Sequence, residues 1–575
     1  CTTVLYEGKP IGTPDAGQFW RVISEHNVST MFTAPTAIRA IKKIDPNGKE
    51  IKKYQLKNFK YLFLAGERAD PETIKWSIDH LKIPVIDHWW QTETGWSIAG
   101  NFPEFGIFEI KYGSTGKAAP GYQVEVLDDY GKNLEAEKMG NLVIKMPLPP
   151  GCSSSIWNDT ERFFKAYLPK MKLHQNIAFG IVQGLELILK ENKALRPTLN
   201  QVLKQNRKWG SRDRRFVGEG LLEIVRWQRK LAMIGKLDIN SHNYYWNLLG
   251  VWIISKKLQL PDWSNFSELN KEAINITLIP KTSKRAFTHS IPDWLDKMGM
   301  KAFGKIVWEK EIKSLNEKAT ITLRTNTIKT TALKLHSHLK KKHQIYTSFI
   351  PKFPDALVLN EHKKLTNLDL YKNGWFEFQD TNSQKVALLA NPTPGMFVID
   401  ACAGSGGKTL HLAALMKNKG RIIAIDTSKN KSNELKNRLK RNGIEIVSHL
   451  CAQNKEIFIK YKEAADIVLI DAPCSGLGVL KRNPAAKWHM NPKRIKKIIE
   501  LQQQILQKYA TLVSKSGSLV YATCSIFPNE NKNQITRFLR SKIGKEFKLL
   551  KEITMLTHKT NGDGFYIAKL LKSSM

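Results

Sequence analysis

Residues 465–475 read ADIVLIDAPCS and place a carboxylate and a thiol three residues apart at the end of an apolar run. The run over 467–470 has the length and composition of a buried parallel strand. Pro473 stops that strand, because proline cannot donate a ladder hydrogen bond. Asp471 and Cys474 are therefore predicted at the carboxyl end of a sheet, the edge at which open α/β folds bind ligands.

A second strand end carries another thiol. Residues 517–525 read GSLVYATCS, and their apolar run over 519–522 predicts a strand that ends just before Cys524. Because the carboxyl ends of parallel strands share one edge, Cys474 and Cys524 are expected to lie close together. The alternative is that each is a buried, inert cysteine, which is the commoner state of a free cysteine.

A glycine-rich turn lies upstream of both thiols. Residues 396–400 predict a strand, 401–407 (ACAGSGG) a turn of small residues, and 408–416 the start of a helix. This arrangement lets a nucleotide-like ligand approach the backbone at a helix start. A further strand over 421–425 ends at Asp426, a carboxylate placed to bind a pair of ribose hydroxyls.

This region resembles the RsmB/NOP-type RNA cytosine-5 methyltransferases, which use S-adenosylmethionine. The resemblance is carried by four blocks, DACAGSGGKT (400–409), DAPCSGLG (471–478), RNPAAKW (482–488) and YATCSIFPNEN (521–531), and extends more weakly back to about residue 171. It implies a Rossmann-like class I methyltransferase core over 387–575. Ahead of the core it implies a small RNA-facing α+β subdomain over 291–386 and a helical, NusB-like or RNA-associated domain over 171–290.

The resemblance also implies roles for the site residues. Cys524 would add as a thiolate to carbon 6 of cytosine, so that carbon 5 can accept the methyl group. Cys474 would assist release of the enzyme, and Asp471 would hydrogen-bond the cytosine ring nitrogen. Lys408 would supply positive charge, because a free thiol has a pKa of about 8.5 and needs such a field or a base to ionise.

S-adenosylmethionine is expected along the glycine turn, with its ribose on Asp426 and its sulfonium beside Asp471. The methionine part is expected on seven consecutive residues: Cys402, Ala403, Gly404, Ser405, Gly406, Gly407 and Lys408. The aspartate that the family commonly places near adenine is replaced here, and Gln453 or Asn454 is the nearest substitute. No metal site is indicated.

Charge is unevenly distributed along the chain. The formal net charge is +38, yet residues 1–170 hold 21 Lys and Arg against 20 Asp and Glu, whereas 171–575 hold 69 against 32. A surplus of this size favours a polyanion such as nucleic acid as the partner. The alternative is a solvated, lysine-rich surface produced by an AT-rich genome.

Patterning between 171 and 386 predicts helices followed by a small sheet. Apolar residues recur on one helical face over 177–189 and over 216–231, and alternation over 321–327 predicts a strand. The segment 374–380 (GWFEFQD) resembles the lead-in to the family's cofactor domain. The run 340–342 is interpreted as a solvated loop.

Two segments are candidates for RNA contact outside the strand ends. Residues 208–216 (KWGSRDRRF) combine arginines with Trp209, which suits single-stranded RNA; the alternative is a bundle with solvated arginines. Trp488 and the pair Lys481 and Arg482 could meet the target base or its neighbouring phosphates, and a structural tryptophan is an equal alternative.

Residues 1–168 carry a second resemblance, to short-chain acyl-CoA synthetases of the acetyl- or propionyl-CoA ligase type. Its blocks are FTAPTAIRAI (32–41), LFLAGERADPET (62–73) and DHWWQTETGW (87–96), and 61–64 reads as a strand. In that family the WQTET region, here 90–94, lines the adenylate and acyl pocket, with Glu93 near magnesium. Because the family's phosphate loop, hinge and catalytic lysine are not found here, we expect a truncated, inactive fragment of partial α/β fold.

The remaining features concern context. Six cysteines without a CxxC pair fit a reducing cytoplasm, and no apolar run reaches the ~18 residues of a membrane span. The chain begins at Cys1 and is expected to be a fragment at that end. The abrupt change between 168 and 171, without a Gly, Pro or Ser linker, indicates a fusion or an assembly error rather than a bifunctional enzyme.

The sequence therefore predicts an α/β RNA cytosine-5 methyltransferase. Ribosomal RNA is the expected substrate, transfer RNA its main rival, and no obligate protein partner is indicated. Two alternatives stay open. An acyl-CoA ligase would need the phosphate-loop and lysine motifs, and a silent RNA-binding or ribosome-assembly factor would be indifferent to the loss of Cys524.

Overall fold

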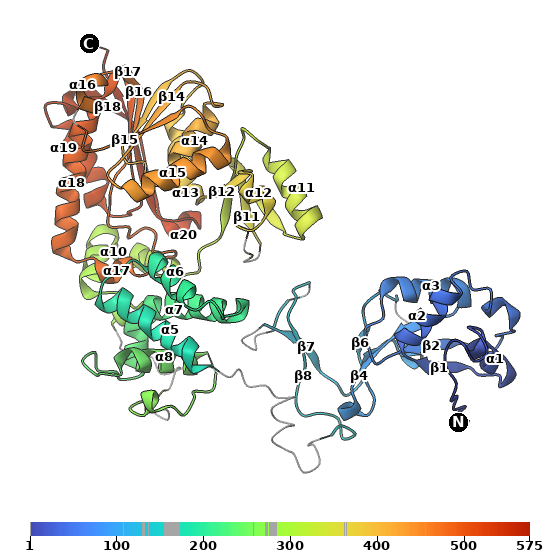
Figure 1. Ribbon diagram of the computed structural model, residues 1–575. Helices are drawn as coiled ribbons and strands as arrows, with labels where there is room; N and C mark the ends of the chain where they lie inside the picture. Colours follow the sequence, from blue (N-terminus) through green and yellow to red (C-terminus); the bar gives the residue numbers. More distant parts are fainter. Residues whose placement is uncertain are drawn as a thin grey trace. The chain divides into compact units, whose positions relative to one another are not determined.

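The structure is a computed structural model that describes residues 2–106, 109–128, 133–135, 137–153, 173–256, 258–270, 274, 284–360, 363, 365–454 and 456–574 (Figure 1). The chain divides into two compact units, Cys1–Lys172 and Leu173–Met575. The junction indicated between 168 and 171 lies outside the described residues. The expected subdivision of the second unit at 290/291 and 386/387 stays a prediction.

The first unit is built on a parallel sheet of order β1-β2-β3, formed by Thr30–Thr33, Tyr61–Leu64 and Val85–Asp87. The strand expected over 61–64 is thus confirmed as the central one. Helices α1 (Gln18–Glu25), α2 (Pro35–Ile44) and α3 (Pro71–Leu81) alternate with these strands and pack against them around Trp20 and Ile38. Five short strands follow in two small antiparallel sheets: β4 (Trp89–Trp90), β5 (Ser97–Gly100) and β6 (Lys117–Ala118), then β7 (Val124–Leu127) and β8 (Asn141–Ile144).

The second unit opens with a helical bundle of α5 (Gln175–Leu185), α6 (Leu195–Gln205), α7 (Ser211–Ile234) and α8 (Tyr244–Ser255) (Figure 1). Both expected apolar stripes are confirmed, since Ile177, Ile181, Phe216 and Val225 are all buried. A π-helical turn, Glu186–Lys190, continues α5.

Trp209 belongs to the core of this bundle. It is 5% exposed, and a Cβ added to Gly180 of α5 would lie 2.4 Å from its ring. The neighbouring Arg214 donates to the main-chain carbonyls of Leu203 and Trp209 at 3.0 Å each. The expectation that Trp209 offers a stacking platform to RNA is therefore wrong, because the indole fills the space that the missing glycine side chain leaves.

Helices α9 (Arg285–Thr288) and α10 (Asp293–Leu315) lead to a four-stranded antiparallel sheet of order β10-β11-β9-β12. Its strands are Thr347–Ile350, Phe353–Leu359, Thr322–Thr325 and Phe376–Phe378, which confirms the strand expected over 321–327. Helices α11 (Ala332–His343) and α12 (Asp369–Lys372) accompany the sheet. The run 340–342 lies in the last turn of α11 rather than in a loop, at the helix end that favours positive charge.

A seven-stranded sheet of order β15-β14-β13-β16-β17-β19-β18 forms the centre of the second unit. Five strands are parallel, namely β13 (Phe397–Asp400), β14 (Arg421–Asp426), β15 (Val447–Cys451), β16 (Ala465–Asp471) and β17 (Val513–Thr523). Antiparallel strands β19 (Phe565–Lys572) and β18 (Phe547–Met555) complete the edge. All four strands expected in this region are confirmed. The strand order reverses between β13 and β16, which makes their carboxyl ends a topological switch point.

Helices cover both faces of this sheet. Val398 and Ile422 face the side of α13 (Thr381–Ala390), α14 (Gly407–Leu415) and α15 (Lys429–Asn442). Ile399 and Ile423 face the side of α16 (Glu456–Lys460), α18 (Pro492–Ala510) and α19 (Lys532–Leu539). Strands that are buried on both faces explain why their sequences are apolar without alternation, and the α/β fold class is confirmed. Two short helices, α17 (Ala486–His489) and α20 (Thr557–Thr560), lie in connecting segments.

Candidate active site

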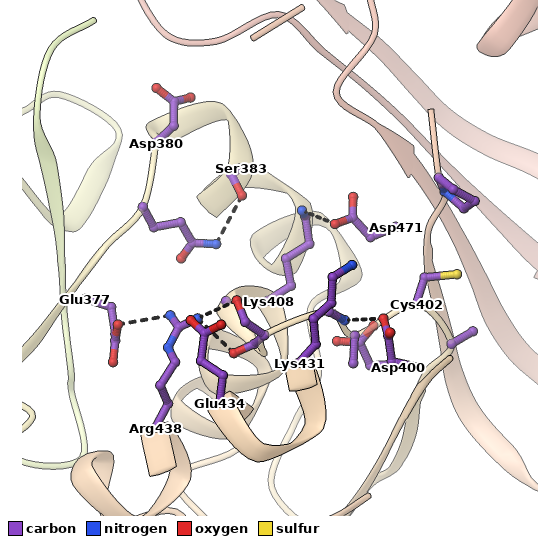
Figure 2. Close-up of a pocket in the computed structure, with 18 of the residues that line it drawn as sticks. Glu377, Asp380, Ser383, Asp400, Cys402, Lys408, Lys431, Glu434, Arg438 and Asp471 are labelled. Atoms are coloured by element: carbon purple, nitrogen blue, oxygen red, sulfur yellow. Dashed lines mark hydrogen bonds and ion pairs between the residues drawn. The ribbon is translucent and has the colours of Figure 1, made fainter. Parts of the chain in front are cut away.

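A cavity of about 1290 Å³ opens at the carboxyl ends of the parallel strands (Figure 2). Asp400, Asp426 and Asp471 line it, as do six of the seven glycine-turn residues expected to bind the cofactor. The seventh, Gly406, faces Leu435 instead; it has a φ of +89°, and a Cβ there would lie 2.2 Å from that side chain. Since ligand pockets span roughly 300–1,000 Å³, this cavity can hold a nucleotide-like cofactor and a second group together.

The two strand-end thiols meet in this region. The Sγ atoms of Cys474 and Cys524 are 3.2 Å apart, because β16 and β17 are parallel neighbours that pair Asp471 with Ala522. The amide of Gly478 donates to the carbonyl of Cys524 at 2.9 Å and ties the two loops together. The hydrogen bond with Cys524, together with burial, raises the pKa of Cys474 well above its ordinary value. Cys474 therefore keeps its proton and can donate it toward the other sulfur.

Glu530 holds the residues that follow both thiols. This fully buried carboxylate accepts from the Ser475 amide at 2.7 Å, and from the hydroxyls of Ser475 and Ser525 at 2.6 Å each. Its position fixes both thiol loops to one point. The sequence predicted no role for Glu530, although a carboxylate in the otherwise neutral PNEN segment is a usable signal.

Lys408 and Asp471 form an ion pair between the glycine turn and the thiol loops (Figure 2). The Nζ to Oδ2 distance is 2.5 Å, and Lys408 is 9% exposed. Burial alone would lower the pKa of Lys408, but Asp471, with smaller effects from Cys524 and Asp400, raises it overall. The ammonium therefore stays charged, and its field reaches Cys524.

Two further strand-end carboxylates shape the cofactor side of the cavity. Burial, reinforced by the charge of Asp471, raises the pKa of Asp400 to about 7, even though the Thr409 hydroxyl donates to Asp400 at 2.7 Å. Asp426 accepts from the Gly404 amide at 2.9 Å and so braces the turn that it faces. Burial also raises the pKa of Cys402, which keeps that thiol neutral.

The glycine turn is held from outside by residues that the sequence did not single out. Arg438 of α15 donates to the Ser405 carbonyl at 2.8 Å and to Glu377 of β12 at 3.0 Å (Figure 2). Arg324, buried in β9, donates to the Gly407 carbonyl at 2.8 Å. The four-stranded sheet thus positions the turn, and no local motif signals these long-range contacts.

Two candidates for RNA contact have structural roles instead. The Trp488 indole donates to the Val225 carbonyl of α7 at 2.6 Å, and Lys481 is 6% exposed with Glu317 at 3.4 Å. Arg482 does line the cavity, where it bridges Asp563 at 2.7 Å and Asp380 at 3.0 Å.

Neither Gln453 nor Asn454, the two candidates for an adenine contact after β15, is among the described residues that line the cavity, and the contact stays a prediction. There the cavity wall is formed by Ala452, while Gln453 accepts from the Cys451 thiol and Asn454 caps α16 by accepting from the Glu456 amide. Among the described residues, no group of three or more His, Cys, Asp or Glu could hold a metal ion. Nor does any described helix combine the length and apolarity needed to cross a membrane.

Three family models match parts of this chain, and two of them describe domains of the same kind of methyltransferase. Residues 387–571 match the 16S rRNA methyltransferase RsmB/F family, and 291–366 match the ferredoxin-like domain of RsmF/B-like methyltransferases. Residues 1–149 match the AMP-binding enzymes. Both resemblances stated from the sequence are thereby confirmed.

Similar proteins support the family match of the second unit. Over 301 residues the chain is 33% identical to the probable ribosomal RNA small subunit methyltransferase B of Synechocystis, covering 50% of this chain and 67% of that protein. It is 32% identical over 308 residues to ribosomal RNA small subunit methyltransferase B of Photorhabdus laumondii, covering 52% and 70%. The crystal structure of PH0851 superposes with a TM-score of 0.61 at 25% identity and covers 70% of this chain and 100% of that one.

The first unit has relatives of a different kind. Over 170 residues it is 54% identical to the uncharacterized protein PA3568 of Pseudomonas aeruginosa and 52% identical to human mitochondrial acyl-CoA synthetase short-chain family member 3. The match covers 29% of this chain in each case, and spans about a quarter of those relatives, 27% and 25% of their lengths.

Proposed function

The chain belongs to the RsmB/F methyltransferase family through its second unit, and on that basis we propose that it transfers a methyl group from S-adenosylmethionine to carbon 5 of a cytosine in RNA. Small-subunit ribosomal RNA is the substrate we propose, with transfer RNA as the alternative. The observation that carries the proposal is the 3.2 Å contact of two thiols beside the charged Lys408–Asp471 pair.

The cavity's residues fit the proposed cofactor, which supplies an electrophilic methyl group on a sulfonium. Gly404 and Gly407 leave open space where a Cβ would stand, so a ligand can approach the backbone there. Asp426 faces the cavity at the position suited to a ribose. One oxygen of the buried Asp400 has no hydrogen-bond partner among the described residues and is available to an ammonium group.

Cys524 is the proposed nucleophile. Its sulfur forms a bond to carbon 6 of the cytosine, and the electron pair of the bond between carbons 5 and 6 moves to carbon 5. Carbon 5 would then take the methyl group, and the electrons of the broken methyl–sulfur bond would leave with the thioether product. The Lys408 ammonium stabilises the negative charge that the attack develops, while Asp471 orients that ammonium and is proposed to bind the ring nitrogen.

Cys474 is proposed to complete the reaction. Its pKa is raised chiefly by its contact with Cys524, so that cause disappears once the Cys524 sulfur is covalently bound to the base. Cys474 then gives its proton to water and, as a thiolate, accepts the proton that leaves carbon 5. The bond between Cys524 and carbon 6 breaks in the same step and restores the thiolate.

The test uses the full chain, tritiated S-adenosylmethionine and unmodified small-subunit ribosomal RNA, with transfer RNA in parallel. Cys524→Ala should abolish labelling, and Cys474→Ala should accumulate a covalent protein–RNA adduct that shifts on a denaturing gel. Cys451→Ala is the matched control, because this exposed thiol should leave labelling unchanged. If the cofactor binds but no RNA is labelled, the chain is a silent RNA-binding factor and the proposal fails.

A further inference from the structure

A second hollow of about 960 Å³, which we call the flank groove, lies between α15 and the segment around α12. Tyr371, Asn437 and Arg441 line both the flank groove and the active-site cavity. The groove therefore continues the cavity along the surface of the second unit rather than forming a separate pocket.

The wall of the flank groove carries one sign of charge. Lys329, Lys372, Lys440 and Arg441 line it, and none of the described residues lining it is a carboxylate. Lys372 pairs with Asp369 at 3.5 Å, but that carboxylate is 86% exposed, and such surface pairs neutralise little. The active-site cavity differs, because both carboxylates and cations line its wall.

Aromatic rings and a guanidinium line the passage between the cavity and the groove. Phe378 lines the cavity, is 39% exposed and lies 5.6 Å from the Tyr371 ring. The Arg441 guanidinium lies 4.1 Å from the centre of that ring, and Glu377 anchors it. These planes offer stacking surfaces for bases that have left a helix.

One ammonium is built into the groove rather than merely exposed there. The Lys329 Nζ donates to the carbonyls of Asn373 at 2.8 Å and Arg441 at 2.7 Å. Its charge is thereby held against the two segments that form the groove, whereas Lys372 and Lys440 are exposed and can reach the phosphates of a bound strand.

We propose that the flank groove binds the single-stranded RNA next to the target cytosine, with phosphates on Lys372 and Lys440 and a base against Tyr371 and Arg441. The inference rests on the proposed function. A target base must leave its stack to reach Cys524. The Lys408–Asp471 pair near this thiol lines the cavity that continues into the groove, so the nucleotides beside the target can follow that path. Cations that follow the phosphates beside flat stacking groups are the combination that binds single strands.

The experiment compares two double variants of the full chain that remove the same charge. Lys372→Ala with Lys440→Ala should raise the KM for RNA about tenfold and leave kcat nearly unchanged. Two lost phosphate contacts should also reduce the slope of log affinity against log salt by about 1.4. Lys340→Ala with Lys341→Ala, exposed lysines in the last turn of α11, is the matched control and should change neither quantity.

Equal KM values and salt slopes for the two double variants would overturn the assignment, because the groove would then contribute no more than any basic surface. The assignment would also be overturned if the groove variants bind RNA as tightly as the wild type. That result is expected if the groove binds an acidic protein segment instead of RNA. Affinity and slope are measured without S-adenosylmethionine. If the wild-type chain methylates no RNA but the groove variants still show the reduced salt slope, RNA binding by the groove is supported and the proposed function is rejected.

Discussion

Both units of this chain bury an aspartate at the last residue of a parallel strand, Asp87 of β3 and Asp400 of β13. Burial raises the pKa of Asp87 to about 6 and that of Asp400 to about 7. One oxygen of each carboxylate has no hydrogen-bond partner among the described residues. In both cases the cause is burial, which takes the carboxylate away from water and disfavours its charged form.

The surroundings of the two aspartates differ. Asp400 shares its cavity with the Lys408–Asp471 pair, close to the two thiols. Asp87 is followed by His88, whose pKa burial lowers and whose ring stands 5.6 Å from the Phe63 ring. A buried strand-end carboxylate therefore does not by itself identify a reaction, and the proposed function rests instead on the ammonium and the paired thiols of the second unit.

The two units also differ in charge. The first 170 residues hold 21 Lys and Arg against 20 Asp and Glu, and the rest hold 69 against 32. A genome-wide bias toward lysine would act on both units, so the near-neutral first unit argues against composition alone as the cause. The surplus follows the unit that carries the methyltransferase site.

The largest effect is expected from removing the ammonium that distinguishes the second site. Lys408→Met should lower kcat for methyl transfer by about 10²–10³-fold, since the negative charge formed by thiolate attack loses its nearest cation. Lys431→Met is the control, because this exposed lysine lines the same cavity without pairing to Asp471. Single-turnover rates measure the difference, and an unchanged rate in Lys408→Met would remove the distinction drawn between the two sites.

A smaller effect is expected at Arg226 of α7, where the helical bundle supports the thiol loops. Arg226 is 6% exposed and donates to the carbonyls of Leu480 at 3.3 Å and Lys481 at 2.8 Å. Arg226→Met leaves these buried acceptors unpaired and should cost about 2–3 kcal/mol. Faster hydrogen exchange of amides 478–489 would report the loss. Arg215→Met, at an exposed position of α7, should leave exchange as it is.

The pH dependence of stability tests the two aspartates directly. The folded-state pKa of Asp400 lies above the 3.8 of an unperturbed aspartate, so the folded state holds its proton more tightly and the free energy of unfolding falls as pH rises between about 4 and about 7. Asp400→Asn removes this penalty and should stabilise the protein by roughly 1–3 kcal/mol above that window. Asp87→Asn should stabilise the protein by a smaller amount, and its pH-dependent gain should be complete near pH 6. Denaturant titrations across this range measure both; a gain that does not change with pH would contradict the assignment.

The smallest effect is expected from charge removal in the first unit. Lys57→Ala with Lys60→Ala removes two exposed lysines there and should leave RNA affinity unchanged, because that unit has almost no charge surplus. Affinity is measured at the salt concentration used for the Lys372 and Lys440 variants. A loss equal to theirs would show that RNA binding follows lysine number rather than the second unit.

Prediction from the sequence succeeded where the information is local. The strands, the glycine turn and the thiol pair follow from apolar runs, small residues and the rule that parallel strands share a carboxyl edge. It was wrong for Trp209, whose indole suggested RNA contact but packs against Gly180 of α5. For Trp488 the sequence left RNA contact and a structural role equally open, and the hydrogen bond to the Val225 carbonyl of α7 favours the structural role.

The sequence by itself determined the α/β class and the family. It also determined which carboxylate or thiol follows each parallel strand. Tertiary structure alone decided that Glu530 joins the two thiol loops, that Arg324 and Arg438 hold the glycine turn, and that the flank groove continues the cavity. The physical reason is that a side chain's burial and hydrogen-bond partners come from segments far away in the chain. No periodicity or motif within one segment contains that information.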